Sequence, residues 1–360
     1  MRVERVQATS FRCYARLDCA PSPGLTAIVG RNGAGKTSLL EATHFGLLGW
    51  TPRTHDDPRV LRDGDDAARV VVRTQLAGRS IESAVGYRPG EPKRISLDGA
   101  PQRSVEALAR TFAVLVFTPD RLAVVKGAPA LRRAYVDRAS ARLWPRFARL
   151  AADYGHVLAQ RGALLRRARA GAASLDGLDV WDAQLAQLGA EVCSVRMRFV
   201  AGVGGPFAEH LARLGGSAED PSLAYRPSGP IDEPGLREAL AARRRRDVAR
   251  GVTGVGPHLD DIAFSDRGRD VRAFGSQGEQ RSAVLALLLA EADLVAEERG
   301  LRPLLLLDDV ASELDAVRRA RLLDAVRERG QALVTTTDAA LVQAQADLVL
   351  HVEAGELAAA

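Results

Sequence analysis

The stretch that decides the fold is Gly30-Arg31-Asn32-Gly33-Ala34-Gly35-Lys36-Thr37, which fills the pattern G-x-x-x-x-G-K-[ST]. Glycines in this pattern let successive backbone N–H groups curl around a phosphate chain. Residues 25–29 (LTAIV) predict a buried strand before the pattern, and residues 38–42 (SLLEA) predict a helix whose N-terminus favours anions. We therefore interpret these eight residues as a cradle for nucleotide phosphates.

Two side chains at the end of the cradle carry its chemistry. Lys36 is expected to hold the β- and γ-phosphates, and Thr37 is expected to ligate Mg²⁺. Lysine is scarce, because Lys36, Lys93 and Lys126 are the lysines among 50 basic residues, so a chance match is rarer than usual. The alternative, a glycine-rich turn without a ligand, is disfavoured by the flanking strand and helix.

Length and composition limit the class of protein. A chain of 360 residues has room for two or three domains, or for one domain with an inserted lobe. Its 46% hydrophobic and 26% charged residues are typical of a globular protein. Cys13, Cys19 and Cys193 lack C-x-x-C spacing, which argues against a disulfide framework or a zinc site. Without an apolar signal core or a spanning run of about 20 residues, we expect a cytoplasmic protein.

The charge balance is compatible with a nucleic-acid partner. The formal net charge is +5, with a pI near 9.4, and nearly all of the positive charge is arginine. Arginine binds phosphate bidentately. An excess of this size also serves solubility, so charge alone does not decide the function.

The organisation of the chain indicates an α/β nucleotide core interrupted by a helical lobe. Short alternating stretches between residues 69 and 104 predict an antiparallel meander, and residues 112–117 (FAVLVF) predict a buried strand. Residues from about 130 to 250 read as helices broken near Gly171 and around Gly202–Pro206. We expect a first core part over residues 1–125, an inserted lobe over 126–250 and a second core part over 251–360.

A basic run lies near the end of the predicted lobe. Arg243-Arg244-Arg245-Arg246 follows a proline-rich stretch and is placed on a helix. Such a run is most often a solvated helix face, and the alternative is a phosphate-binding surface. We assign part of a DNA-binding surface to these four residues as a hypothesis.

A second motif, which contains two aspartates, lies far from the cradle in the sequence. Residues 304–307 (LLLL) predict a buried strand that ends at Asp308 and Asp309, the arrangement of a Walker B segment. Asp308 is expected to hold Mg²⁺, directly or through water, and Asp309 to orient or deprotonate the attacking water. An apolar run ending in two aspartates can also be a strand followed by a helix cap, but the cradle favours the Walker B interpretation.

The loop before the apolar helix at 282–296 completes the pattern. Residues 274–281 (FGSQGEQR) place Ser276 and Gly278 at the N-terminus of that helix, where a hydroxyl and free N–H groups suit a terminal phosphate. A plain N-cap is the alternative reading. The order of cradle, this loop, the Asp-Asp strand and then residues 311–315 (ASELD) favours the phosphate contact.

This order resembles the ABC-type ATPases, in which the signature loop of one protomer closes over ATP held by the other. Within them the chain resembles the RecF family, relatives of the structural-maintenance-of-chromosomes (SMC) ATPases. The resemblance covers nearly the whole chain and includes several further stretches: residues 11–14 (FRCY), 116–120 (VFTPD), Arg132-Arg133 with Asp137, Gln160-Arg161 with Leu164-Leu165, and 256–258 (GPH). It implies that Arg12 approaches the base or ribose of the nucleotide.

The resemblance also implies the partners and the reaction. It implies ATP and Mg²⁺ as cofactors, an ATP-bound homodimer, weak DNA-dependent ATP hydrolysis, and DNA at gaps or single-strand/double-strand junctions. It further implies that RecO and RecR act with the protein in loading the recombinase in recombinational repair and replication restart. The sequence itself displays none of these partners.

Three positions depart from the ABC pattern. Thr335-Thr336-Thr337-Asp338 stands where transporter-type ATPases place a switch histidine, so phosphate sensing would fall to a threonine. No glutamine lies between Gln102 and Gln160, leaving Thr118 or Asp120 as substitutes for the lid glutamine. Asp309 stands where a glutamate is usual, and a shorter carboxylate fits slow hydrolysis.

Two other functions remain open from the sequence. A P-loop kinase acting on a small molecule would use the middle lobe to bind its substrate, but it has no need for a signature loop in trans. A structural DNA-binding module with a vestigial nucleotide site is disfavoured by intact Lys36, Thr37, Asp308 and Asp309.

Overall fold

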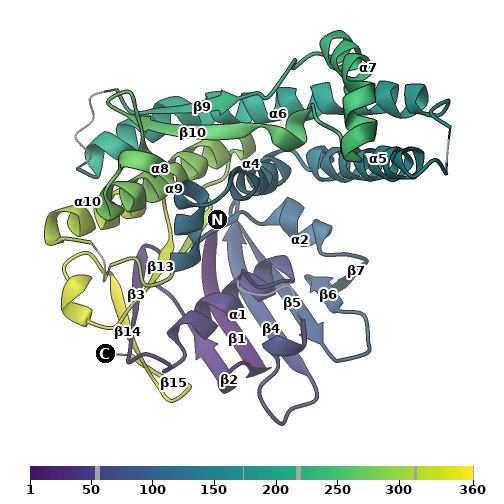
Figure 1. Cartoon of the computed structure of the whole chain (residues 1–360). Coiled ribbons are helices and arrows are strands. Elements are labelled where there is room, and N and C mark those ends of the chain that lie inside the picture. Colours follow the sequence, from purple (N-terminus) through teal and green to yellow (C-terminus); the bar gives the residue numbers. More distant parts are fainter. Residues whose placement is uncertain (53–56, 173, 216–219, 312–313, 360) are drawn as a thin grey trace. The chain divides into compact units, whose positions relative to one another are not determined.

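A computed structural model of the chain describes residues 1–52, 57–172, 174–215, 220–311 and 314–359 (Figure 1). The chain divides into two compact units. Unit 1 contains Met1–Arg121, Arg213–Gly215 and Glu291–Ala360, whereas unit 2 contains Leu122–Ala212 and Gly216–Ala290. The domain boundaries expected at residues 125 and 250 stay a prediction.

The phosphate cradle belongs to a mainly parallel sheet of unit 1. Its strand order is β15-β14-β3-β13-β12-β8, with β15 antiparallel at one edge and the other five strands parallel. The strands are β3 (Leu25–Val29), β8 (Val114–Phe117), β12 (Leu304–Leu307), β13 (Ala332–Thr336), β14 (Leu348–Glu353) and β15 (Glu356–Ala359). Every residue of β3, β8, β12 and β13 is buried, as expected of strands covered on both faces. The parallel strands bring their carboxyl ends to one edge.

A second, antiparallel sheet of unit 1 confirms the predicted meander. Its order is β2-β1-β4-β5-β6-β7. The strands are β1 (Arg2–Phe11), β2 (Tyr14–Cys19), β4 (Ala68–Leu76), β5 (Arg79–Tyr87), β6 (Arg94–Leu97) and β7 (Ala100–Gln102). In β1, buried Val6 and Ala8 alternate with exposed Gln7 and Thr9, the pattern of a sheet with one face on a core and one face in water.

Helix α1 (Lys36–Leu48) is the centre of the unit 1 core. It packs against β1, β4 and β5 of the antiparallel sheet and against β13 of the other sheet (Figure 1). Leu39, Ala42 and Phe45 are fully buried, and most of the other residues of the helix are buried too, including polar ones such as Glu41 and Thr43. The helix that begins in the phosphate cradle is thus fixed on both sides. The remaining short elements of this unit are η1 (Asp57–Val60), α2 (Glu106–Thr111), η2 (Pro119–Leu122, whose last residue belongs to unit 2), α10 (Ala316–Glu328) and η4 (Ala339–Leu341).

Unit 2 is mainly helical, as the sequence predicts, with one small sheet. Its helices are α3 (Ala123–Lys126), α4 (Pro129–Leu143), α5 (Arg146–Arg169), α6 (Leu178–Arg213), α7 (Glu233–Arg250), η3 (Pro257–Leu259), α8 (Val271–Phe274) and the first part of α9 (Gln277–Arg299). Its sheet has the order β11-β10-β9, from β9 (Ser222–Arg226), β10 (Asp261–Asp266) and β11 (Arg269–Asp270). Strand β9 lies within the proline-rich stretch, where the sequence pattern predicts no strand.

The expected helix break around Gly202–Pro206 is wrong. Helix α6 runs without interruption from Leu178 to Arg213 and contains Pro206 in its interior. Proline removes one helical hydrogen bond, but tertiary packing offsets that loss. Val203 and Phe207 on either side are fully buried, and the Phe207 ring packs edge-on against Phe264 with centroids 5.9 Å apart. The other expected break is confirmed, because α5 ends at Arg169, just before Gly171.

A buried ion network joins three helices of unit 2. Arg161 of α5, fully buried, donates to Asp182 of α6 (2.7 Å) and to Asp247 of α7 (2.9 Å). Arg161 also donates to Thr253 (2.8 Å), and Arg244 of α7 donates to the second oxygen of Asp182 (2.7 Å). Two arginines therefore balance two buried aspartates, and removal of one partner leaves an uncompensated charge.

Replacing Arg161 with Met keeps much of the side-chain length but removes the charge that faces Asp182 and Asp247. We expect Arg161→Met to lower the free energy of unfolding by about 3–5 kcal/mol, measured by urea denaturation. Arg149→Met is the matched control. Arg149 is 89% exposed, and its ion pair with Asp153, at 3.6 Å, lies in solvent and should contribute little to stability. Equal unfolding midpoints for the two variants would contradict a structural role for the network.

Candidate nucleotide-binding site

The cradle forms a tight turn from β3 into α1. Gly30 N–H donates to Thr336 O (3.3 Å), and Ala34 N–H donates to Arg31 O (3.1 Å). Gly33 and Gly35 have φ of 82° and 120°, in the left-handed region that favours glycine. At Gly35 a Cβ would also lie 2.8 Å from Cys13 Sγ and 3.1 Å from the Tyr14 hydroxyl oxygen. The backbone of the loop therefore requires glycine there.

The N-terminus of α1 is open to an anion. Gly35 is its N-cap residue and supplies no side-chain cap, and the first turn contains no acidic residue. The first N–H groups of such a helix lack intrahelical partners and carry the positive end of its dipole. A hollow of about 460 Å³ lies along Gly30–Ala34 and His351–Ala354, so the outer side of the loop is accessible to a ligand.

Lys36 lies folded back across the cradle. Its Nζ donates to Gly30 O (2.7 Å) and Arg31 O (3.0 Å). Burial lowers the pKa of Lys36, and the nearby charges of Asp309 and Asp308 oppose that shift. The ammonium is thus held inside the loop that is expected to surround the phosphates, in contact with replaceable backbone carbonyls.

Asp308 connects the cradle to the second motif. Thr37 Oγ1 donates to Asp308 Oδ1 (2.8 Å), although the two residues are 271 positions apart. Thr335, at the end of β13, donates to the same oxygen, also at 2.8 Å. Strands β3, β13 and β12 are neighbours in the sheet, so their carboxyl ends bring these three side chains together.

Thr37 and Asp308 fit a magnesium ion. A hydroxyl and a carboxylate are hard oxygen ligands, and Mg²⁺ commonly takes one or two such protein ligands together with phosphates and waters. In the part of the chain that the structure describes, no group of three or more His, Cys, Asp or Glu residues is placed to hold a metal ion. At a Thr37–Asp308 site, phosphate oxygens and waters would supply the other ligands.

Asp309 has a strained backbone beside this contact. Its φ of 50° lies in the left-handed region, which aspartate tolerates better than most residues. Its N–H donates to Thr335 Oγ1 (2.9 Å), so one threonine hydroxyl positions both aspartates. The sequence points to a threonine in this stretch for phosphate sensing, but it does not identify Thr335 as a partner of the Walker B residues.

Arg12 lies in the turn between β1 and β2, with a φ of 54°. Its guanidinium pairs with Glu41 of α1 through Nε at 3.0 Å, and Glu41 is 2% exposed. The main-chain N–H of Arg12 donates to Val60 O (2.8 Å). The pair ties Arg12 to the helix that follows the cradle, while its approach to the nucleotide base or ribose stays a prediction.

Ser276 and Gly278 lie in unit 2, at the start of α9. Ser276 N–H donates to Glu279 Oε2 (2.7 Å), and Glu279 N–H donates to Ser276 Oγ (3.2 Å). This reciprocal pair is a capping box, so the helix-cap interpretation is correct as far as it goes. Ser276 is exposed, Gly278 is half-buried, and the preceding Phe274 is 73% exposed. The contact of Ser276 and Gly278 with a phosphate stays a prediction.

The remaining candidate residues have varied surroundings. Thr118 follows β8, and Asp120 is exposed within η2. Their role as lid residues stays a prediction. His258 belongs to the 256–258 (GPH) stretch of the family resemblance, and both of its ring nitrogens are engaged, with Tyr154 (2.8 Å) and with Thr253 O (3.1 Å), which indicates a structural role. In the segment 311–315, residues 312 and 313 lie outside the described residues.

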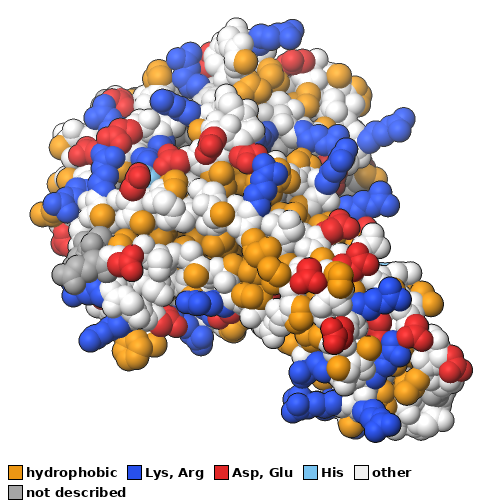
Figure 2. Space-filling model, turned by 90° about the horizontal axis from the view of Figure 1, so that it is seen from above, with side chains coloured by type: hydrophobic (Ala, Val, Ile, Leu, Met, Phe, Trp, Pro, Cys, Tyr) orange, Lys and Arg blue, Asp and Glu red, His pale blue; other side chains and the backbone are white. Residues whose placement is uncertain are grey.

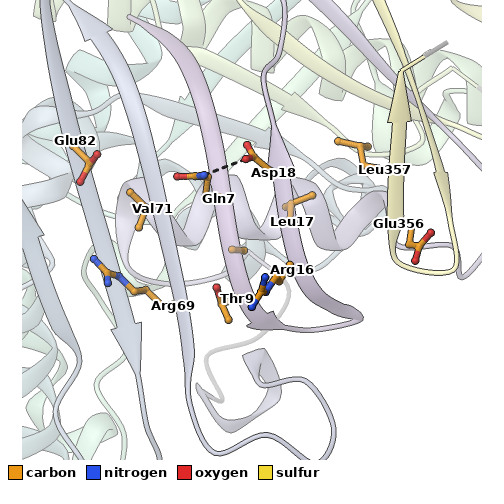
Figure 3. Close-up of a pocket in the computed structure, with 11 residues that line it drawn as sticks. Gln7, Thr9, Arg16, Leu17, Asp18, Arg69, Val71, Glu82, Glu356 and Leu357 are labelled. Atoms are coloured by element: carbon orange, nitrogen blue, oxygen red, sulfur yellow. Dashed lines mark hydrogen bonds between the residues drawn. The ribbon is translucent and has the colours of Figure 1, made fainter.

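A larger hollow of about 760 Å³ lies away from the cradle, on the outer face of the antiparallel sheet (Figure 3). It is lined by Gln7, Leu17, Asp18 and Leu357 among others. Asp18 already accepts hydrogen bonds from Arg5 and Gln7, and the hollow contains no glycine-rich loop or helix N-terminus. We therefore place the nucleotide at the cradle and not in the larger hollow.

The fold and the two joined motifs define a P-loop ATPase of the ABC class. Residues 2–356 match the RecF/RecN/SMC N terminal domain family. The chain belongs to this group and, within it, to the RecF family, as its curated relatives show. The DNA replication and repair protein RecF of Kineococcus radiotolerans is 38% identical over 93% of this chain and 92% of its own length. The RecF protein of Myxococcus xanthus is 38% identical over 99% of this chain and 97% of its own length.

Solved structures agree with this assignment. A structure of the recombination mediator protein RecF with ATP, described as part of the RecFOR pathway, superposes with a TM-score of 0.87 at 25% identity. The match covers 100% of this chain and 97% of that one. An Smc head bound to the C-winged helix domain of ScpA superposes with a TM-score of 0.62 at 17% identity. The match covers 100% of this chain and 97% of that one, and the two proteins share the fold. None of the helices in the described part of the chain has the length and hydropathy of a membrane span.

We expect Thr335→Val to reduce the rate of ATP hydrolysis about tenfold with little change in ATP affinity. The substitution removes one hydrogen bond to Asp308 and one to the Asp309 N–H, and a barrier increase of about 1.4 kcal/mol corresponds to that factor. The measurement is steady-state phosphate release at saturating ATP.

Thr74→Val is the matched control for this prediction, because Thr74 is equally buried but its hydroxyl has no hydrogen-bond partner among the described residues. An unchanged hydrolysis rate in Thr335→Val would show that Thr335 does not position the two aspartates for catalysis. A similar loss in both variants would indicate a general effect of removing a buried hydroxyl.

Proposed function

We propose that this protein is an ATP-dependent DNA-binding protein of recombinational DNA repair and replication restart. It closes as an ATP-bound dimer on DNA, assists recombinase loading at gaps, and uses slow hydrolysis as a release timer. The observation that carries the proposal is the Thr37–Asp308 contact, which joins the phosphate cradle to the Walker B carboxylate at 2.8 Å. The names of the curated relatives and of the ATP-bound structure support it.

Each complete site would combine two copies of the chain. One copy supplies Gly30–Thr37, Asp308 and Asp309, and the other supplies Ser276 and Gly278. The signature helix α9 begins with a capping box, so the exposed Ser276 hydroxyl and the backbone of Gly278 are already arranged at a positive helix end. Only a nucleotide with a γ-phosphate reaches from the cradle to that second surface.

The residues of this chain divide the chemistry of hydrolysis. Lys36 exchanges the carbonyls of Gly30 and Arg31 for phosphate oxygens and stabilises their negative charge. Asp309 orients the attacking water and accepts its proton. When bound by Thr37 and Asp308, Mg²⁺ supplies positive charge at the phosphates. The short side chain of Asp309 suits slow ATP hydrolysis. We propose that DNA binding stimulates this hydrolysis.

The biological partners belong to the same proposal. We place the protein in the cytoplasm, at gapped DNA or at junctions of single and double strands, with RecR and RecO as partners in recombinase loading. The ATP-bound relative is described as a member of the RecFOR pathway, which supports that assignment. Arginine side chains on the surface would contact the phosphate backbone without sequence preference.

A small-molecule kinase is the alternative with a P-loop. It would leave Ser276 and Gly278 without a role in a second copy, and its oligomeric state would not depend on the γ-phosphate. Dependence of self-association on ATP therefore separates the two functions.

We expect ATP with Mg²⁺, but not ADP, to convert the protein from monomer to dimer in sedimentation velocity experiments. Ser276→Arg should abolish that shift, because a long cation replaces the small hydroxyl that meets the γ-phosphate. Ser80→Arg adds the same charge at an exposed position of β5 and should dimerise normally. An ATP-dependent dimer that persists undiminished in Ser276→Arg would refute the contact in trans.

A further inference from the structure

The four adjacent arginines of α7 do not form one surface. Arg244 points inward and pairs with Asp179 and Asp182, and Arg243 is half-buried. Arg245 and Arg246 are exposed. Since Arg244 is part of the buried ion network, only the second half of the run is available to a partner.

The last turn of α5 adds three more exposed arginines. Arg166, Arg167 and Arg169 all lie there. The C-cap residue of α7 is Gly251, with φ of 69°, and a Cβ on it would lie 3.2 Å from Arg166 Cγ and 3.6 Å from Arg169 Nη1. The C-terminal ends of α5 and α7 are therefore side by side, and Arg250 lies next to their junction.

These residues form a single group, which we call the arginine end of unit 2. It consists of the exposed residues Arg166, Arg167, Arg169, Arg245, Arg246 and Arg250. Arg246 and Arg250 are four residues apart and share one face of α7, as Arg166 and Arg169 share one face of α5. Figure 2 shows one face of the molecule, from which basic side chains project at several places with acidic side chains among them.

The arginine end lacks internal partners. In the part of the chain that the structure describes, none of its six side chains forms an ion pair or a hydrogen bond. By contrast, Arg132, Arg196 and Arg244 of the same unit are each paired with aspartates. Cations near a helix C-terminus are favourable, but neighbouring like charges at this spacing repel. Three arginines in one last turn exceed what helix capping requires.

A buried ion pair between α5 and α7 fixes the spacing of the two helix ends that carry these arginines. Arg161 of α5 and Asp247 of α7 are both buried and joined at 2.9 Å, one to two turns before the two helix ends. Asp247 O also accepts the N–H of Gly251 (2.7 Å), which fixes the end of α7. The backbone positions from which these arginines extend are thus held by a rigid base.

We propose that the arginine end binds the phosphate backbone of DNA. The proposal rests on the DNA-binding function proposed above and assigns it a surface: the ends of α5 and α7 rather than the run Arg243–Arg246. Guanidinium groups bind phosphates bidentately and without reading the bases. An anionic membrane is the other polyanion to consider. Helices that bind membrane surfaces use exposed aromatic and leucine side chains, whereas the exposed apolar neighbour at this junction is Val252.

The test compares two triple variants that lose the same charge. Arg166→Gln/Arg169→Gln/Arg250→Gln alters the arginine end, and Arg69→Gln/Arg79→Gln/Arg103→Gln alters three exposed arginines of unit 1. Binding of a duplex with a single-stranded gap is measured with ATP at several salt concentrations. The slope of log affinity against log salt is negative, and each lost phosphate contact reduces its magnitude by about 0.9, so we expect a reduction in magnitude of up to about 2.7 in the first variant. The control should keep the wild-type slope.

Each outcome decides a separate point. An unchanged slope in the first variant, or an equal decrease in both, overturns the arginine end as the DNA surface. Wild-type protein that binds no DNA with ATP overturns the proposed function, and this inference with it. Vesicles of phosphatidylserine and phosphatidylcholine provide a second probe, and tighter binding to them that is lost in the same variant would assign the surface to a membrane instead.

Thermal unfolding shows whether the first variant folds. Two further variants keep the test decisive if it does not. Arg167→Gln/Arg245→Gln/Arg246→Gln removes the other three charges of the arginine end and should reduce the magnitude of the slope in the same way. Arg166→Lys/Arg169→Lys/Arg250→Lys keeps the charge and should retain the wild-type slope. A wild-type slope in the second glutamine variant would by itself contradict the proposal.

Discussion

One carboxylate oxygen holds the nucleotide site together. Asp308 Oδ1 accepts from Thr37, which ends the phosphate cradle, and from Thr335, at the end of the strand between β3 and β12. Thr335 then accepts from the N–H of Asp309, so both aspartates are fixed by one hydroxyl. This arrangement depends on parallel strands whose carboxyl ends meet at one edge and on a core helix, α1, that is buried between two sheets. The ATPase class of the fold follows from that geometry.

In the proposed dimer, each chain supplies a different part of the composite site. The residues proposed to hold the phosphates and Mg²⁺ belong to unit 1, whereas Ser276 and Gly278, proposed as the signature residues, belong to unit 2. The loop before α9 is ordered by the reciprocal hydrogen bonds between Ser276 and Glu279, which cap the helix. A loop that is already ordered would lose little conformational freedom on meeting a γ-phosphate, which supports the proposal that ATP links two copies.

Local patterns in the sequence predict the parts of the structure that depend on local chemistry. The strand–loop–helix form of the cradle, the apolar strand before Asp308, the antiparallel meander and the helical character of the lobe are confirmed, since glycine spacing and strand periodicity act over a few residues. Contacts between distant residues leave no such pattern. Neither the Thr335 hydrogen bonds nor the pairing of Arg161 with Asp182 and Asp247 has a sequence signal, and the break expected at Pro206 is overridden by buried packing.

The central claim is that ATP joins the cradle of one copy to the signature loop of another. Cross-linking of two differently tagged chains tests it most directly, one with Asn32→Cys and the other with Gln277→Cys, both exposed positions. Both chains carry Cys13→Ser, which removes the exposed native cysteine and leaves Cys19 and Cys193 buried. With a short bismaleimide, we predict a product containing both tags in ATP and Mg²⁺ but not in ADP. Absence of that product with ATP, or equal amounts with and without nucleotide, would contradict the account.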